Sequence, residues 1–484
     1  MANAEILLVQ TEVGNWDKIS KYRNLPLSLI SVARLLPKDK VKLIDLRLDS
    51  EEKFLNELKK NPILVCFSSM TGENIKYAIN ASRLVKKFSS SFVVWGGIHP
   101  SLLPKQTLNE SCIDFVVKGQ GEEILLYLYD CLKKHKKIKG RDGLYFKDEK
   151  KVFVGKGCAI VDLEKLPLPA YELIDLSTYF MVYRGKKMLP IETSRGCPFC
   201  CSFCVSKNIF SNWRPYPLDM IISNIKYFSN VGVKHIMIID VNFFSDINRV
   251  LKFAQILVDL NLGITWHAQG ITFNDLVKLN GEDLNLLIHS GMTEFEAVGV
   301  ESGSPRIQKS LNKNINLGGV ILYNKFISKY GIKVRYNFFI GSPEENIADL
   351  KLTINLILRL IKENEYASSS ILYLYTPYPG NKLFDIALSK GFIAPITLKG
   401  WGDLKGWDSA NLPWLSRKRK ILLEKINFLS MFLSTEYAEK YFSNNYLLFF
   451  LVYIYGIFAR FRLKHLFFMF MPEKRVANWI LKNY

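Results

Sequence analysis

Cysteine is scarce in this sequence. The chain has 8 cysteines among 484 residues, and its first residues, Met-Ala-Asn-Ala-Glu, show no secretory signal pattern. A disulfide-stabilised extracellular fold is therefore not expected, because such folds need a high density of cysteine pairs. Four cysteines stand singly along the chain, and we interpret them as buried free thiols: Cys66, Cys112, Cys131 and Cys158.

Long apolar runs are also missing. The apolar run over residues 446–459 has 14 residues, whereas a membrane-spanning helix needs about 20. The sequence shows neither long repeats nor a low-complexity tract. At about 150 residues per domain, the length predicts two or three globular domains.

Acidic residues are outnumbered by basic ones. The chain has 65 Lys and Arg against 45 Asp and Glu, which gives a net charge of +20. This excess predicts attraction to an anionic partner, either nucleic acid, a membrane surface or a phosphorylated substrate. No nucleic-acid reader module is recognisable, so nucleic acid is the least favoured of the three.

Three cysteines are concentrated in one short segment, Thr-Ser-Arg-Gly-Cys-Pro-Phe-Cys-Cys-Ser-Phe-Cys. Cys197, Cys201 and Cys204 have the spacing Cys-x3-Cys-x2-Cys. Thiolates of this kind hold 4Fe–4S clusters, usually in fours, so three ligands would leave one iron open for chemistry. Cys200 adds two Cys-x2-Cys pairs, but zinc is disfavoured because the spacer of about 15–20 residues between such pairs is missing.

The cysteine segment resembles the signature of the radical S-adenosylmethionine (SAM) superfamily, and Ser-Arg-Gly-Cys-Pro is a common lead-in to it. The resemblance implies that Cys197, Cys201 and Cys204 bind a 4Fe–4S cluster and that Phe203 lies near the adenine of SAM. In that family the open iron binds SAM, and an electron from the cluster produces a 5′-deoxyadenosyl radical. Cys200 falls on a variable position and is not expected to be a ligand.

Residues 1–140 alternate short apolar runs with amphipathic segments. Strands are predicted at 6–9, 41–46, 63–67, 92–95 and 115–117, and helices at 27–36, 51–60, 73–88 and 121–134. This alternation predicts a flavodoxin-like (Rossmann-type) parallel sheet, whose ligands bind beyond the carboxyl ends of the strands.

The strand ends of this first region are rich in glycine. Gly-Gly-x-His-Pro followed by Gly-x-Gly-Glu resembles the cobalamin-binding domain that precedes many radical SAM enzymes. The resemblance implies cobalamin contacts from Ser68, Thr71, Gly96, Gly97, Gly119, Gly121 and Glu122. The motif Asp-x-His-x-x-Gly is missing after the second strand, so no histidine ligand to cobalt is expected, and His99 is interpreted as structural. The alternative is a sheet that binds nothing.

Residues 185–400 repeat the alternation after the cysteine segment. Strands are predicted at 188–193, 235–240, 264–268, 294–300, 334–340 and 369–375, and their order resembles the partial (β/α)6 barrel of the radical SAM superfamily. Strand-end residues implied to contact SAM are Asp240, Gln269, Glu301 and Arg335. The structural alternative for Asp240 is that it caps a helix. The structural alternative for Arg335 is that it forms a surface salt bridge.

The remaining segments are a linker at 141–184 and a helical, basic and aromatic region at 401–484. The second region is interpreted as a helical cap over the active site, with peripheral membrane contact through residues 446–471 as the alternative or an addition. The protein is expected in the cytoplasm, with peripheral contact to the inner face of the membrane as the second option.

These features together predict a cobalamin-dependent radical SAM enzyme that functionalises an unactivated carbon. Methyl transfer to a bulky apolar or lipid-like substrate is the preferred reaction, and ring formation or rearrangement, as in the anaerobic magnesium-protoporphyrin cyclase, is the alternative. A non-catalytic iron–sulfur or cobalamin-binding protein is the third hypothesis. The family also implies an electron donor of the flavodoxin or ferredoxin type. No residue is assigned as catalytic.

Overall fold

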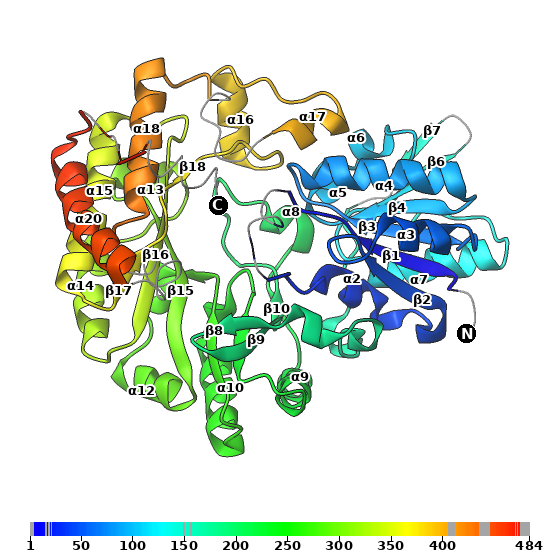
Figure 1. The fold of residues 1–484 in the computed structure, drawn as a ribbon, viewed down its shortest axis with the longest axis horizontal. Coiled ribbons are helices and arrows are strands. Elements are labelled where there is room, and N and C mark those ends of the chain that lie inside the picture. Colours follow the sequence, from blue (N-terminus) through cyan, green and yellow to red (C-terminus); the bar gives the residue numbers. More distant parts are fainter. Residues whose placement is uncertain are drawn as a thin grey trace.

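Two large sheets, a two-stranded sheet and a set of C-terminal helices form the described part of the protein, shown in a computed structural model (Figure 1). The structure describes residues 4–14, 17, 20, 22–148, 151–154, 157–404, 412–434, 446–469, 471 and 473–474. The blue and cyan N-terminal sheet lies on one side of the molecule and the green and yellow second sheet on the other.

The N-terminal sheet has the strand order β2-β1-β3-β4-β5-β6-β7. Its first five strands are parallel, with the bounds β1 Ile6–Gln10, β2 Val41–Asp45, β3 Leu64–Ser68, β4 Phe92–Gly96 and β5 Phe115–Val117. The connecting helices are α2 Leu27–Val32, α3 Glu51–Leu58, α4 Asn74–Phe88, α5 Ile98–Leu102, α6 Pro104–Leu108 and α7 Glu122–Lys133. The interiors of the central strands β1, β3 and β4 are buried because helices cover both faces, as expected for a parallel sheet.

Residues 141–184, expected to be a linker, contribute strands to both sheets. β6 (Leu144–Asp148) and β7 (Lys151–Val154) extend the N-terminal sheet by antiparallel pairing. β8 (Met181–Tyr183) pairs antiparallel with β9 (Lys186–Ile191) at the edge of the second sheet. The N-terminal sheet therefore continues beyond residue 140.

The second sheet is a curled half-barrel with the order β17-β16-β15-β13-β12-β9-β8. Its remaining strands are β12 His235–Ile238, β13 Thr265–Ala268, β15 Met292–Glu301, β16 Lys333–Ile340 and β17 Ala367–Ser369, with β14 Ile271–Thr272 paired to β15 and β18 Tyr373–Leu374 paired to β16. The pairs after β9 are parallel. Helices on the convex side are α9 Leu218–Asn230, α10 Ile247–Leu260, α12 Gly281–His289, α14 Leu317–Ser328 and α15 Ile347–Glu363.

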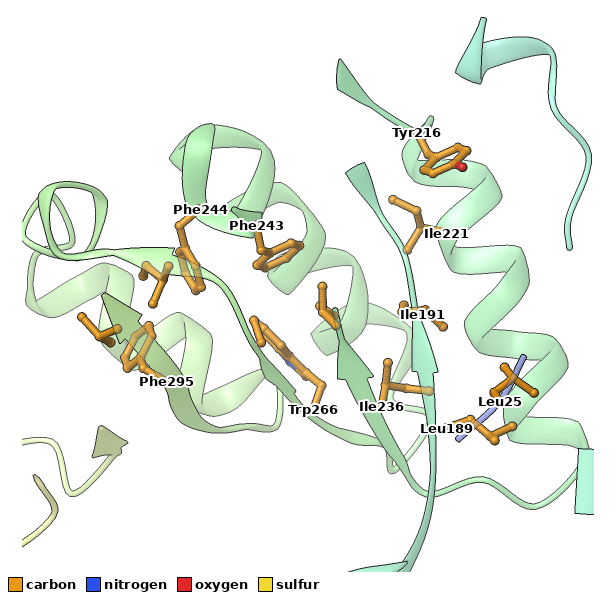
Figure 2. Packing of buried hydrophobic residues seen from close by; sticks show 14 of the residues in the cluster. Leu25, Leu189, Ile191, Tyr216, Ile221, Ile236, Phe243, Phe244, Trp266 and Phe295 are labelled. Atoms are coloured by element: carbon orange, nitrogen blue, oxygen red, sulfur yellow. The ribbon is translucent and has the colours of Figure 1, made fainter. Parts of the chain in front are cut away.

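Aromatic side chains fill the space between this sheet and its helices (Figure 2). The ring of Trp266 lies edge-on to the rings of Phe243 and Phe253, with centroids 5.8 and 5.4 Å away. Leu25 of the N-terminal region belongs to the same buried cluster as Leu189 of β9. One core thus runs through both sheets, which holds the two domains in a defined relation.

The C-terminal helices contact both domains. α17 (Leu398–Asp403) packs against α4, and its Trp401 is buried in the N-terminal core. α18 (Arg417–Ser430) packs against α20 (Tyr446–His465), which also contacts α15 (Figure 1). None of the helices in the described part of the chain is long and apolar enough to cross a membrane.

Candidate functional site

The cysteine segment begins where β9 ends, at the carboxyl edge of the half-barrel. Ser194 and Arg195 form a short strand, β10, that pairs with β11 (Arg214–Pro215). Gly196 follows with a φ of +86°, and a Cβ there would lie 2.3 Å from the carbonyl oxygen of Asn212. Only glycine permits this turn, which directs the next residues over the end of the barrel.

The three candidate cluster ligands lie in a partly desolvated environment. Cys197 is buried and Cys201 is half-buried, and burial raises the pKa of the Cys201 thiol to about 11. The positive charge of the Lys313 ammonium group acts in the opposite direction and lowers the pKa of Cys201, because it favours the thiolate. Cys200 is exposed, and its carbonyl accepts a hydrogen bond of 2.9 Å from Asn312.

Lys313 is a site residue that the sequence did not reveal. It is buried, and its Nζ lies 3.2 Å from Oε1 of Glu301 and 3.1 Å from the carbonyl oxygen of Gly299. Glu301 has a positive φ of 70°, a strained conformation that the surrounding contacts must maintain. The sequence gives only weak evidence for Lys313, because it is the return of the chain through the short helix α13 (Pro305–Ser310) that brings this residue back to the end of β15.

Asp240 follows β12 and is hydrogen-bonded to the lead-in of the cysteine segment. Its carboxylate accepts bonds of 2.6 Å from Thr193 N, 2.6 Å from Thr193 Oγ1 and 2.5 Å from Ser194 Oγ. Burial raises the pKa of Asp240 to about 6. All of these contacts position the segment that leads to Cys197.

Gln269 and Arg335 both point to Glu296, which lies in the middle of β15. Gln269 Nε2 donates to Glu296 Oε2 at 2.7 Å, and the Arg335 guanidinium pairs with Oε1. Nε2 of His267 lies 3.0 Å from Oε2, and its Nδ1 lies 2.6 Å from Nε2 of His235. Burial alone would raise the pKa of Glu296, but the His267 hydrogen bond and the Arg335 charge overcome it and hold the value at about 2.

Glu296 was missed by sequence reasoning, although a glutamate inside an apolar strand was the available signal. It connects two residues that were predicted separately as SAM contacts. Phe203, which was also predicted to contact SAM, packs edge-on against Phe339 of β16, with ring centroids 5.3 Å apart. The roles of these residues toward SAM stay predictions.

A cavity of about 450 Å³ lies between the two domains. Its lining includes all but one of the predicted cobalamin contacts: Ser68, Gly96, Gly97, Gly119, Gly121 and Glu122. Thr71 lies outside this lining, and its Oγ1 is 2.9 Å from Nδ1 of His99. The barrel contributes Glu192, Arg195 and Ile239 to the opposite wall.

Glycines make the carboxyl edge of the N-terminal sheet compact. Gly97 has a φ of +97°, and a Cβ there would lie 2.7 Å from the carbonyl oxygen of Ser69. Gly119 has a φ of +93°, and a Cβ would lie 2.6 Å from the carbonyl oxygen of Ala159. Larger residues at either position would displace the loops that form the cavity wall.

His99 is fully buried and is absent from the residues that line this cavity. Burial lowers its pKa to about 4, and its ring centroid lies 5.9 Å from that of Trp401. These contacts place His99 in the packing between α5 and α17. The volume and the glycine-rich, partly apolar wall fit the flat ring of a large cofactor.

A buried ion pair closes the space between the cavity and the cysteine segment. Arg195 Nη2 lies 2.7 Å from Glu122 Oε1, and Arg195 Nε lies 2.9 Å from Glu192 Oε2. Tyr216 donates to the same Glu192 oxygen at 2.9 Å. Arg195 precedes Cys197 by two residues, so this pair joins the edge of the N-terminal domain directly to the cluster segment.

Within the described residues, no three His, Cys, Asp or Glu side chains converge on a single metal ion. Three thiols beside a buried ammonium group are suited to an anionic iron–sulfur cluster.

Comparisons with known proteins agree with this geometry. Residues 191–357 match the radical SAM superfamily, and residues 20–128 match the B12 binding domain. An uncharacterized methyltransferase from Pyrococcus horikoshii is 30% identical over 321 residues, which cover 65% of this chain and 67% of that protein. The hopanoid C-3 methylase of Methylococcus capsulatus is 25% identical over 366 residues, which cover 74% and 67% of the two chains.

Solved structures show the same fold. The cobalamin-dependent SAM radical enzyme OxsB, with aqua-cobalamin bound, superposes with a TM-score of 0.73 at 18% identity, over 99% of this chain and 75% of that one. The radical SAM methyltransferase TsrM from Kitasatospora setae gives 0.66 at 18% identity, over 81% and 79%. The cofactors of this protein are therefore a 4Fe–4S cluster, SAM and cobalamin, and the chain belongs to the cobalamin-dependent radical SAM methyltransferase family.

Proposed function

We propose that this enzyme transfers a methyl group to an unactivated carbon of a bulky apolar substrate. The observation that carries the proposal is the cavity between the domains, whose wall combines predicted cobalamin contacts with Arg195 and Glu192 beside the cluster segment. The bound cofactors supply a transferable methyl group and a radical able to abstract hydrogen. In this proposal the two cofactor sites are neighbours, because Arg195 of the cavity wall precedes Cys197 by two residues.

The residues of the chain contribute binding and orientation in this proposal. Cys197, Cys201 and Cys204 hold the cluster, and the charge of Lys313 stabilises their thiolates. Glu301 at the end of β15 and the pair Gln269 and Glu296 present polar atoms to SAM within the half-barrel. Asp240 keeps the cluster segment in register by accepting its three hydrogen bonds.

The substrate class rests on the relatives and on the surface of α20. Two relatives are named as methylases of a hopanoid and of bacteriochlorophyllide d. The outer face of α20 exposes a stripe of apolar side chains at helical spacing: Leu447, Phe450, Leu451, Ile454, Ile457, Phe458 and Phe461. Such a face near the basic Lys464 favours peripheral contact with an anionic membrane, where an apolar substrate would be taken up.

Ring formation is the second candidate, since an anaerobic magnesium-protoporphyrin IX monomethyl ester cyclase from Synechocystis is 27% identical over 235 residues. The reconstituted enzyme should be incubated without oxygen with SAM, cobalamin, a reductant and candidate substrates. Methyl transfer predicts both 5′-deoxyadenosine and S-adenosylhomocysteine. 5′-Deoxyadenosine without S-adenosylhomocysteine, in the presence of a converted substrate, would favour ring formation. Formation of neither would contradict both reactions.

A further inference from the structure

A chain of buried polar side chains crosses the concave face of the half-barrel. His235 begins β12, and its Nε2 lies 2.6 Å from Nδ1 of His267 in β13. Nε2 of His267 lies 3.0 Å from Oε2 of Glu296 in β15. Thr265 ends the chain at the amino edge of the barrel, with its Oγ1 2.8 Å from Nδ1 of His235. Three neighbouring strands thus share one continuous set of hydrogen bonds.

All four ring nitrogens of the two histidines have partners within this chain. Both rings are buried, and burial lowers the pKa of His235 to about 3, so this ring stays neutral. The pKa of Glu296 is about 2, so its carboxylate is ionised and can only accept. Nε2 of His267 therefore carries the hydrogen of the bond to Glu296. The chain holds the ring of His267, and through it the carboxylate, in one orientation.

The strand register places Glu296 in one layer of the half-barrel. Backbone pairing joins one residue from each of five strands: Ile191, Ile238, Ala268, Phe295 and Val334. These side chains are buried in the core, so the next residue along each strand points to the concave face. Those next residues form the barrel layer: Glu192, Ile239, Gln269, Glu296 and Arg335. Glu192 and Ile239 line the cavity between the domains, so the barrel layer borders that cavity.

Glu296 binds two other members of the barrel layer. Nε2 of Gln269 donates to Oε2 of Glu296 at 2.7 Å. Nε of Arg335 donates to the carbonyl oxygen of Glu296 at 2.9 Å, and its guanidinium pairs with Oε1. Removing such charged groups from water costs free energy, and apolar side chains of similar volume are often no less stable. The polar set is therefore better explained by the side chains that it orients than by stability alone.

We propose that His267 and His235 are positioning residues, which hold the carboxylate of Glu296 so that it orients Gln269 and Arg335 toward SAM. The inference rests on the proposed function, to which the SAM contacts of these two residues belong. The histidines do not touch the cofactor in this role, because their ring nitrogens are engaged with Thr265, with each other and with Glu296. No proton or electron is transferred along the chain.

The test keeps or removes the hydrogen bond of one ring. His267→Gln has an amide NH2 that can still donate to Glu296, whereas His267→Leu has a similar volume and cannot donate. We expect His267→Leu to raise the dissociation constant of SAM at least about tenfold, because it leaves a charged carboxylate without one of its donors. His267→Gln should stay within about threefold of the unmodified enzyme.

Tyr183→Phe is the matched control on the same buried cluster. The ring of Tyr183 stacks on that of His235 with centroids 4.0 Å apart, and phenylalanine keeps this stacking. The hydroxyl of Tyr183 meets Thr293 at 3.3 Å and takes no part in the chain to Glu296. The control should therefore bind SAM as the unmodified enzyme does. Iron content and the visible absorbance of the cluster verify that each variant folds.

Two measurements on the cluster-loaded protein avoid any dependence on turnover. Equilibrium dialysis gives the dissociation constant of SAM. Electron paramagnetic resonance of the reduced cluster follows the spectral change that added SAM produces. His267→Leu should need at least about ten times more SAM than the unmodified enzyme for half of this change, and His267→Gln should not.

Equal dissociation constants for His267→Leu and the unmodified enzyme would overturn the positioning role. Equal losses in His267→Leu and His267→Gln would overturn it too, because the hydrogen bond would then be irrelevant. If His267→Leu does not fold, Glu296→Gln decides instead, and SAM affinity like that of the unmodified enzyme would overturn the role. An unmodified enzyme that binds SAM but converts no candidate substrate would contradict the proposed function, while the dissociation constants would still decide the role of the histidines.

Discussion

At the scale of single residues, the cysteine segment separates ligands from a neighbour of the same type. Cys197 is buried and Cys201 is half-buried, whereas Cys200 and Cys204 are exposed. The positive charge of Lys313 acts on the thiols of Cys197, Cys201 and Cys204. The buried Lys313 lies on the inner side with Glu301. The predicted ligands differ from Cys200 in their position relative to Lys313, since all four residues are of the same type.

The first prediction concerns this distinction. Cys201→Ala should remove the visible absorbance of the cluster and the formation of 5′-deoxyadenosine, because two thiolates cannot retain a 4Fe–4S cluster. Cys200→Ala should keep iron content and product formation within about twofold of the unmodified enzyme. Iron and sulfide analysis with product quantification measures both. Cluster loss in the Cys200→Ala variant would show that a fourth cysteine takes part.

The second prediction is a pH dependence that originates at His99. Its pKa is about 4 in the folded protein, whereas an unfolded histidine titrates near 6.5. Between these values the unfolded chain binds a proton that the folded chain does not, so His99 makes the free energy of unfolding fall as pH decreases from 6.5 to 4. His99→Asn removes this contribution. The stability advantage of the unmodified protein over the variant should therefore be about 2 kcal/mol smaller at pH 5 than at pH 7.

Urea unfolding followed by tryptophan fluorescence at both pH values measures the effect. His289→Asn serves as the control for exchanging His for Asn, since His289 is exposed. A stability difference for His99→Asn that does not change with pH would contradict a neutral, buried histidine at this position.

At the scale of elements, helix ends and faces follow from local sequence, but their partners do not. α15 begins with a capping box formed by Asn346 and Asp349, and α12 with one formed by Asn280 and Asp283. α20 is different, because it exposes apolar side chains along one face in the described part of the chain. An exposed apolar stripe of this size marks an interaction surface.

The third prediction tests α20 as a membrane-contacting helix. Phe450→Ser combined with Ile457→Ser should lower binding to anionic lipid vesicles by at least about tenfold, because each side chain contributes about 1.5–3 kcal/mol when transferred from water to an apolar phase. Thermal stability should be unchanged, since both side chains are more than half exposed.

Leu322→Ser is the matched control for this experiment, because Leu322 is 70% exposed on α14. The Leu322→Ser variant should sediment with the vesicles to the same extent as the unmodified protein. If the double variant binds vesicles as strongly as the control does, the face of α20 is not a lipid contact.

At the scale of the whole molecule, the arrangement of the two sheets creates the cavity. The carboxyl edge of the N-terminal sheet faces that of the half-barrel, and α17 reaches from the barrel side to the N-terminal core through Trp401 (Figure 1). The Glu122–Arg195 pair lies at this junction. The junction therefore fixes the position of the cavity relative to the cysteine segment, and it would fix the spacing of the cofactors that these two sites hold.

The fourth prediction addresses this pair. Arg195→Met should destabilise the protein by about 3–5 kcal/mol, because it leaves the buried carboxylate of Glu122 and the half-buried carboxylate of Glu192 without their cation. Cobalamin affinity should fall about tenfold, since Glu122 and Arg195 both line the cavity. Adding Glu122→Leu should recover part of the stability. The free energy of unfolding should therefore fall less in the double variant than the sum of the decreases in the two single variants.

Urea unfolding of the four proteins in this cycle, together with equilibrium dialysis of cobalamin, measures both effects. Strictly additive losses would show that the two side chains do not interact across the junction. In that case the ion pair would have no part in holding the domains together.

The sequence by itself determined the parallel strands of both sheets, most of the helices between them and the family of this protein. Alternation of apolar runs with amphipathic segments predicted the parallel sheet and the half-barrel, since strand and helix periodicities are local properties. The spacing of Cys197, Cys201 and Cys204 predicted the cluster site. This spacing is also a local property, because all three residues lie in one short segment.

Only the tertiary structure decided which side chains meet. Lys313 beside the cluster segment, Glu296 between Gln269 and Arg335, and the Glu122–Arg195 pair each join residues that are distant in sequence. The sheet extension by β6 and β7 likewise depends on a pairing partner. Such contacts depend on the packing of whole elements, so no local pattern of residues specifies them.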